Sequence, residues 1–274
     1  MTDESVRSLL IAARTSDLET IESLIRRDPS IHIGSDYDGR TALHTAASYG
    51  NCDAVRLLLD LGASPHTRTI DGATALNSAC SAGHDQIVRL LLEGGAQVNP
   101  SCQITSALHE AAACGSTECC TLLVAFGSKL EMSDCNYGTP LHCACYFGHA
   151  AVAKVLLDAG ANVNARMNHR TPLHYAVERH SSNETLTLLL LAYGASPWIE
   201  NNAGRRPAEV SPENTVTYRI LRWLEGHPRS LQEWCRLTLL SAGCGRFVMT
   251  VAPVGMRRFL SCAEIMGDTV CSRR

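Results

Sequence analysis

The sequence lacks the features that usually mark secreted, membrane-spanning and nucleic-acid-binding proteins. Its first ten residues, MTDESVRSLL, have neither the basic start nor the apolar stretch of a signal peptide. No apolar run approaches the roughly 18 residues that a membrane-spanning helix needs. The formal net charge of -3 over 274 residues indicates no basic surface for nucleic acid or anionic lipid. We therefore expect a protein of the cytoplasm or nucleus with no membrane or nucleic-acid partner.

Catalytic motifs are also missing. No Gly-Lys-Ser or Gly-Lys-Thr element suggests a phosphate-binding loop, and Gly243-Cys244-Gly245 lacks the rest of a dinucleotide fingerprint. A thiol nucleophile would need an activating environment that the sequence does not indicate. We therefore expect a protein that is not an enzyme and has no catalytic residue, cofactor or metal. An enzyme within the C-terminal region is the last of the alternatives.

What the chain does contain is a repeat with a period of roughly 33 residues. Each copy opens with a Leu-His pair or its equivalent and continues into a leucine-rich segment that ends at a glycine. The opening pairs are Leu43-His44, Leu76-Asn77, Leu108-His109, Leu141-His142 and Leu173-His174, and the closing glycines are Gly62, Gly95, Gly127, Gly160 and Gly194. A regular repeat of this length predicts a stack of similar units.

The fourth copy, residues 134–164, shows how each unit is expected to fold. Thr139 is a good N-cap, and Pro140 suits the first position of a helix because its missing N–H costs nothing there. Gly148 closes this first helix, and Gly160 stands where a second, apolar helix needs a left-handed stop. Neither helix can bury its apolar face alone, so each unit must pack on its neighbours.

These copies resemble ankyrin repeats. The resemblance implies an all-α solenoid of helix-turn-helix repeats joined by β-hairpin loops. The expected array covers residues 5–225, and two further residues are expected between the helices of the fifth repeat, at 180–183. The array comprises a capping repeat at 5–34, repeats at about 36–67, 69–99, 101–130, 134–164 and 167–197, and a degenerate repeat at 201–225.

The cysteines and histidines are most simply explained by the repeat. Of the 13 cysteines, Cys80 and Cys145 stand where other copies have alanine, and a free cysteine packs as a small hydrophobic residue. Without a secretory signal the thiols are expected to stay reduced. The densest cluster of possible metal ligands is His142, Cys143, Cys145 and His149, but its spacing matches no zinc pattern. We expect the repeated histidine to form hydrogen bonds between units instead.

A different segment, residues 228–274, follows the array. Ser230 and Glu233 form a capping box, which predicts a new helix. An ankyrin array followed by PRSLQEWCRLTL resembles the ankyrin repeat and SOCS box family, whose members act as substrate-recognition subunits of ubiquitin ligases. In that family a short helix inserts Leu and Cys into a pocket on elongin C, and elongin B joins the complex.

The resemblance implies that Leu231, Cys235 and Leu239 contact elongin C, because they match the family motif and line one stripe of the predicted helix. The alternative is that they cap the last repeat. From Ser241 onward the chain departs from the family, because the Leu-Pro-x-Pro element that helps to choose a cullin scaffold is missing. We therefore expect elongin binding, and weak or absent cullin binding.

The substrate is expected on the concave side of the array, where hairpin tips and first helices lie. The candidates are Tyr49, Tyr146, Phe147, Tyr175 and Arg179 on first helices, with Arg40 and Arg170 at matching hairpin positions. Aromatic and arginine side chains dominate interface hot spots. Tyr146, Phe147, Tyr175 and Arg179 are predicted to form the main anchor, with residues 180–183 at its edge. The alternative is that some of these rings pack between repeats.

Besides an enzyme within the C-terminal region, which ranks last, two functions remain open at this point. The first is an adaptor that holds a substrate protein on the repeats and docks on elongin C. The second is an ankyrin scaffold or inhibitor with no link to a ligase. The identity of the substrate does not follow from the repeats, because a fold does not determine a function.

Overall fold

The computed structural model describes residues 2–99, 105–134, 137–178 and 184–226. Within these ranges the fold is all-α and has no β-strand, as the sequence predicted. The expected hairpin loops are reduced to single antiparallel bridges, Ser35 with Thr41 and Met167 with Arg170. The described residues fall into two compact units, one within Met1–Ala161 and one within Asn162–Arg274.

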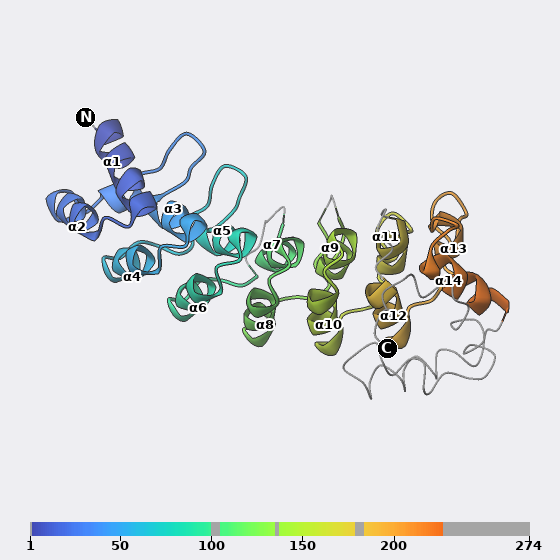
Figure 1. The fold of residues 1–274 in the computed structure, drawn as a ribbon. Coiled ribbons are helices and arrows are strands. Elements are labelled where there is room, and N and C mark those ends of the chain that lie inside the picture. The colour runs from blue at the N-terminus through green and yellow to red at the C-terminus, as the bar shows by residue number, and fades with distance from the viewer. Residues whose placement is uncertain (1, 100–104, 135–136, 179–183, 227–274) are drawn as a thin grey trace, which may run out of the picture. The chain divides into compact units, whose positions relative to one another are not determined.

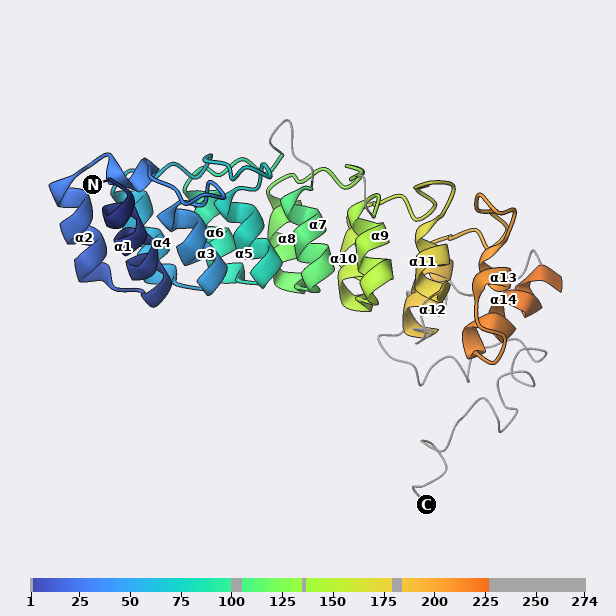
Figure 2. The ribbon, with the colours of Figure 1, turned by 90° about the horizontal axis from the view of Figure 1, so that it is seen from above.

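In the first unit, the odd-numbered helices pack side by side in one row and the even-numbered helices in a second (Figures 1 and 2). Each repeat contributes one helix to each row. The helices are α1 (Thr2–Thr15), α2 (Leu18–Arg27), α3 (Ala42–Tyr49), α4 (Cys52–Asp60), α5 (Ala75–Ala82), α6 (Asp85–Glu93), α7 (Ala107–Cys114), α8 (Thr117–Ala125), α9 (Pro140–Phe147) and α10 (Ala150–Asp158), with a short 3-10 helix at Ile31–Ile33.

The local signals read from the fourth repeat are confirmed. Thr139 is the N-cap of α9, Pro140 is its first residue, and Gly148 ends it in the left-handed region with φ of 79°. Gly160 follows α10 with φ of 94°. An L-residue with a side chain rarely adopts these angles, so glycine fixes where each helix stops.

Each of the five repeats buries the leucine of its opening pair in the core. Leu43, Leu76, Leu108, Leu141 and Leu173 are each at most 2% exposed. Burying one such side chain stabilises the fold by roughly 1.5–3 kcal/mol. The periodic leucine therefore contributes strongly to the packing of neighbouring repeats within each unit.

The second unit contains α11 (Pro172–Glu178), α12 (Glu184–Ala192), α13 (Pro207–Val210) and α14 (Val216–Gly226). The last helix stands at the end of the segment predicted as a degenerate repeat, and it runs from Val216 to Gly226. Its start is fixed by Thr215, whose hydroxyl accepts a hydrogen bond from the N–H of Tyr218 at 3.1 Å.

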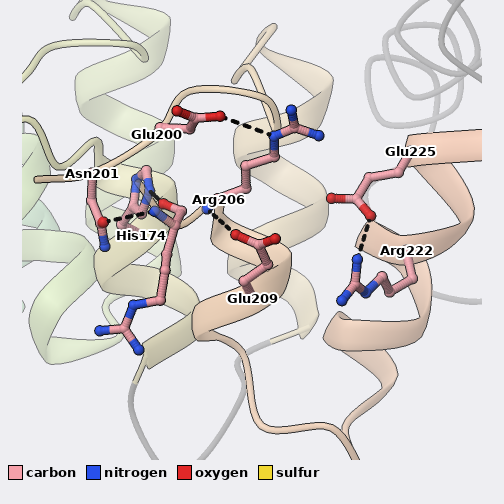
Figure 3. Close-up of polar contacts among 8 residues, drawn as sticks. His174, Glu200, Asn201, Arg206, Glu209, Arg222 and Glu225 are labelled. Carbon is pink, nitrogen blue, oxygen red and sulfur yellow. Dashed lines mark hydrogen bonds and ion pairs between the residues drawn. The ribbon is translucent and has the colours of Figure 1, made fainter. Parts of the chain in front are cut away.

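Exposed ionic contacts tie the loop before α13 to that helix (Figure 3). The Nε of Arg206 lies 3.6 Å from Oε1 of Glu200, and the N–H of Arg206 donates to Oε2 of Glu209 at 2.9 Å. On α14, Arg222 pairs with Glu225 at 2.8 Å. Such exposed pairs contribute at most about 1 kcal/mol each, so the buried leucines matter more than these charges.

Candidate functional site

The repeated histidine joins neighbouring repeats, as expected from the sequence. Its Nε2 lies near a backbone carbonyl oxygen in the hairpin loop of the next repeat: His44 to Ala73 at 3.3 Å, His109 to Gly138 at 2.7 Å, and His174 to Arg205 at 3.3 Å. In the repeat without histidine, Nδ2 of Asn77 donates to the carbonyl of Thr105 at 3.2 Å. These side chains are structural links between repeats.

The second ring nitrogen fixes the tautomer of these histidines. The backbone N–H of Thr41 donates to Nδ1 of His44 at 3.2 Å, and the same contact recurs at His109 and His174. Because Nδ1 accepts, Nε2 carries the proton and donates it to the next repeat. Burial, as the largest cause, lowers the pKa of His44, His109 and His174 below the ordinary value of 6.5. The folded state therefore holds neutral imidazoles.

These lowered pKa values predict a loss of stability in weak acid. As the pH falls through 6.5, the unfolded chain takes up protons at these histidines, whereas the folded chain does so only at lower pH. The contribution of the neutral histidines to the free energy of unfolding is therefore complete above pH 6.5 and decreases below it. At one pH unit below 6.5 the loss is at most about 1.4 kcal/mol for each histidine. The free energy of unfolding, measured with denaturant at about pH 7.5 and at about pH 5.5, gives the size of this loss.

A variant with His44→Asn, His109→Asn and His174→Asn is the control for this prediction. Asparagine can make both contacts without titrating, as Asn77 does with the N–H of Thr74 and the carbonyl of Thr105. We expect the pH dependence to be much flatter in the triple variant. An unchanged slope would show that other groups cause it.

A second set of polar links runs backwards along the array, and sequence reasoning missed it. Nε2 of His84 lies 3.3 Å from the carbonyl oxygen of Ser48, and Nε2 of His149 lies 3.1 Å from that of Ala113. Both histidines are N-caps of second helices, and both reach the end of the preceding repeat's first helix. His149 therefore has a structural role in the stack.

The cysteines near these histidines are unsuited to nucleophilic chemistry. Cys143 and Cys145 on α9 are buried, and burial raises the pKa of both thiols well above its ordinary value. Burial also raises the pKa of Cys120 to about 12. A protonated, buried thiol is a poor nucleophile and a poor metal ligand. Among the described residues, no group of three or more His, Cys, Asp or Glu side chains could hold a metal ion.

Aromatic rings gather on the first unit where α9 ends. Tyr146 and Phe147 meet edge to face with ring centroids 5.0 Å apart, and Tyr137 from the preceding hairpin loop lies 5.1 Å from Tyr146 and 5.6 Å from Phe147. His149 stacks on Phe147 at 6.3 Å. We call these four residues the aromatic cluster. Phe147 is 38% exposed, and Tyr137 and Tyr146 are half-buried.

Sequence reasoning placed Tyr146 and Phe147 correctly on a first helix but did not include Tyr137. That residue stands two positions before the helix N-cap, where Gly39 and Gly72 lie in earlier repeats. Its neighbour Gly138 adopts φ of 89° and makes the turn instead. The shifted glycine leaves a tyrosine beside α9, which the sequence alone did not show.

Tyr175 is a correction, because it was expected to be exposed and is 8% exposed. The guanidinium carbon of Arg170 lies 4.5 Å from the centre of the tyrosine ring, and Arg170 also pairs with Glu178. Arg170 from the hairpin loop therefore covers part of this ring rather than extending into solvent. Arg179 and the predicted insertion at 180–183 lie outside the described residues.

Tyr49 and Arg40 are exposed, as expected, but they do not lie beside the aromatic cluster. Tyr49 ends α3, while the cluster lies on α9, with α5 and α7 between them in the row (Figure 1). The guanidinium carbon of Arg14 lies 5.2 Å from the centre of the Tyr49 ring. The first unit thus carries two separate candidate surfaces.

The predicted elongin-binding residues Leu231, Cys235 and Leu239 lie outside the described residues, as do Gly243-Cys244-Gly245 and the rest of the C-terminal segment. Within the described part of the chain, none of the helices has the length and apolar character needed to cross a membrane.

Family models of ankyrin repeats match most of the described array. A family model described as ankyrin repeats (3 copies) matches residues 61–134 and 108–201, and one described as ankyrin repeats (many copies) matches residues 24–77. Among solved structures, the human ASB11 ankyrin repeat domain is 30% identical with a TM-score of 0.74, covering 80% of this chain and 98% of that one. The ankyrin repeat domain of Bcl-3 is 26% identical with a TM-score of 0.64, covering 78% and 97%.

Curated relatives of the chain are named as ankyrin repeat and SOCS box proteins. "Ankyrin repeat and SOCS box protein 9" of Mus musculus is 36% identical over 141 residues, which are 52% of this chain and 48% of the relative. "Ankyrin repeat and SOCS box protein 5" of Mus musculus is 37% identical over 134 residues, which are 49% and 40%. The chain therefore spans about half or less of the length of the curated relatives it matches.

Proposed function

Because the chain belongs to the ankyrin repeat and SOCS box family, we propose that it is a non-catalytic adaptor of a ubiquitin ligase. Its repeats would hold a target protein, and its C-terminal helix would dock on elongin C of an elongin B/C-containing cullin-RING ligase. The observation that carries the proposal is the Leu231, Cys235, Leu239 stripe that follows directly on the array.

The physical basis for the elongin contact is the spacing of these three residues. Positions i, i+4 and i+8 of a helix lie on one side, so on the predicted helix two aliphatic side chains and a thiol would form a narrow apolar stripe. Such a stripe fits the common mode in which a helix places a few anchors in an apolar groove. Because the Leu-Pro-x-Pro element is missing, we expect the elongin pair to bind and a cullin to be held weakly or not at all.

For the target protein, we propose the aromatic cluster as an anchor. Tyr146 and Phe147 are held in place by ring contacts with Tyr137 and His149, so little side-chain freedom is lost when a partner binds. Phe147 keeps a third of its surface in contact with solvent. Rigid, partly exposed aromatic side chains are typical of interface hot spots. Arg170 and Arg179 of the second unit remain candidate contacts, whereas the buried Tyr175 does not.

Replacing Tyr146 and Phe147 with alanine should weaken the binding of target proteins to the chain. Loss of two anchors is expected to reduce labelling of direct partners by roughly tenfold or more. Proximity labelling in cells with the full-length chain measures this effect. Tyr175 is left intact, because a change to a buried ring would test folding rather than binding.

The matched control is Phe126→Ala, which removes a 46% exposed ring at the end of α8, outside the cluster. Circular dichroism should show both variants folded. The control is expected to keep the wild-type partner list. If the folded Tyr146→Ala/Phe147→Ala variant keeps it as well, the cluster is not the anchor.

A further inference from the structure

A groove at the N-terminal end of the first unit has a composition unlike that of the whole chain. It has a volume of about 230 Å³ and lies between α1, α3 and the hairpin loop before α3. Its wall includes Arg7, Ile11, Arg14, Asp36, Arg40 and Tyr49. We call it the N-terminal groove.

The groove carries a surplus of positive charge. Arg7, Arg14 and Arg40 are exposed, and within the described part of the chain none of them forms an ion pair with a carboxylate. The wall includes one acidic residue, Asp36, whose Oδ1 accepts the backbone N–H groups of Asp38 and Arg40 at 3.0 and 2.8 Å. Three guanidinium groups against this one carboxylate leave the groove positively charged in a protein whose formal net charge is -3.

Apolar surface lies among these charges. Ile11 is 56% exposed and Tyr49 is 53% exposed. Arg14 lies over one face of the Tyr49 ring, which fixes both side chains relative to each other. A ligand for this groove would thus combine carboxylates with an aliphatic or aromatic side chain.

The groove continues along the row of first helices. A second hollow of about 300 Å³ shares Arg40 and Ser48 with it and is also lined by Asn77, Ser78 and Glu110, from α5 and α7. Its small polar side chains leave room for a backbone to pass. The charge changes sign along this path, with three arginines at the end near α1 and Glu110 at the other. An extended segment fits such a path better than the surface of a folded domain does.

We propose that the N-terminal groove binds an extended, acidic segment of a target protein that carries an aliphatic or aromatic side chain. The carboxylates pair with Arg7, Arg14 and Arg40, and the apolar side chain packs against Ile11 and Tyr49. The acidic part lies over α1 and α3, and the chain continues toward Glu110. This inference rests on the proposed function only in taking the segment from a protein that the array recruits.

The test uses the full-length chain and fluorescent synthetic peptides, read by fluorescence anisotropy. The probe is the peptide EDEFLDE, with QNQFLNQ and EDEGSDE as peptides that lack the charges or the apolar side chains. We expect EDEFLDE to bind at least about tenfold more tightly than either of the others, with an affinity that falls as salt is raised. Equal binding of the three peptides, or no binding of EDEFLDE, would overturn the proposal.

Variants of the chain locate the site. Arg7→Gln/Arg14→Gln should weaken EDEFLDE binding about tenfold or more, because two charge-assisted contacts are lost. Arg56→Gln/Arg89→Gln removes the same charge from exposed positions on α4 and α6 and should leave binding unchanged. Equal weakening by both pairs would point to non-specific charge attraction and contradict the assignment. Thermal melts should show each variant folded.

Two further measurements separate this proposal from others. A short fluorescent single-stranded DNA that binds more tightly than EDEFLDE would show that the groove prefers phosphate, and the peptide assignment would be wrong. Purified elongin B–C is then added to Arg7→Gln/Arg14→Gln. We expect this variant to keep elongin binding, so failure of the groove and failure of the adaptor function give different results.

Discussion

Replacing Leu231 with serine and Cys235 with phenylalanine is expected to abolish binding of the elongin B–C pair. The change removes one apolar anchor of the predicted helix and enlarges another beyond what a pocket shaped for cysteine would accept. Loss of one buried anchor typically costs about 2 kcal/mol or more, which is a factor of roughly 30 in affinity. Isothermal titration of the purified full-length chain with purified elongin B–C measures the change.

The matched control for this prediction is Glu233→Gln. Residue 233 lies on the opposite side of the predicted helix from Leu231 and Cys235, and glutamine preserves the capping box with Ser230. Elongin affinity should stay at the wild-type value. A double variant that binds elongins normally but melts at a lower temperature would indicate that Leu231 and Cys235 cap the last repeat instead.

Gly115→Ala is expected to destabilise the array by roughly 2–3 kcal/mol, from backbone strain and a lost hydrogen bond. Gly115 has φ of 85°, which disfavours any residue with a Cβ. A Cβ at this position would also lie 2.7 Å from Nδ1 and Cε1 of His149. The imidazole would have to move and would lose its contact with the carbonyl of Ala113. Denaturant unfolding followed by circular dichroism measures the loss.

The array supplies a close control in Gly127. Gly127 has φ of 82°, but a Cβ there would meet nothing within 4 Å, so Gly127→Ala should cost only the backbone strain of about 1 kcal/mol. In a His149→Ala background, Gly115→Ala should cost only the backbone strain as well, since the ring that clashes and its hydrogen bond are already absent. Equal destabilisation by the two glycine variants would mean that the packing of Gly115 on His149 adds nothing.

Much of the fold followed from the sequence, because each repeat carries its own local signals. The cap, the leucine, the histidine and the stop glycine recur together, so an error in one copy is corrected by the others. Thr139, Pro140 and Gly148 could be assigned to positions in a helix without knowledge of any neighbour. The hydrogen bonds that the repeated histidines make to the next repeat were also predictable, because a polar residue at a buried helix start needs a partner.

The candidate surfaces were less predictable, since they depend on where side chains from different segments meet. Tyr175 has the spacing of an exposed position, yet Arg170 from the preceding loop lies over its ring. Tyr137 joins Tyr146 only because the turn glycine is shifted by one residue. The N-terminal groove involves α1 of the capping repeat, which lacks the repeated opening, so no counting from a motif could locate Ile11 or Arg14.

The central claim is that this array is linked to a ubiquitin ligase through elongins. Affinity purification of the tagged wild-type chain from cells, followed by mass spectrometry, tests it most directly. The account predicts that elongin B and elongin C are recovered together with target proteins. Recovery of target proteins without either elongin would contradict it and would identify the chain as an ankyrin scaffold or inhibitor.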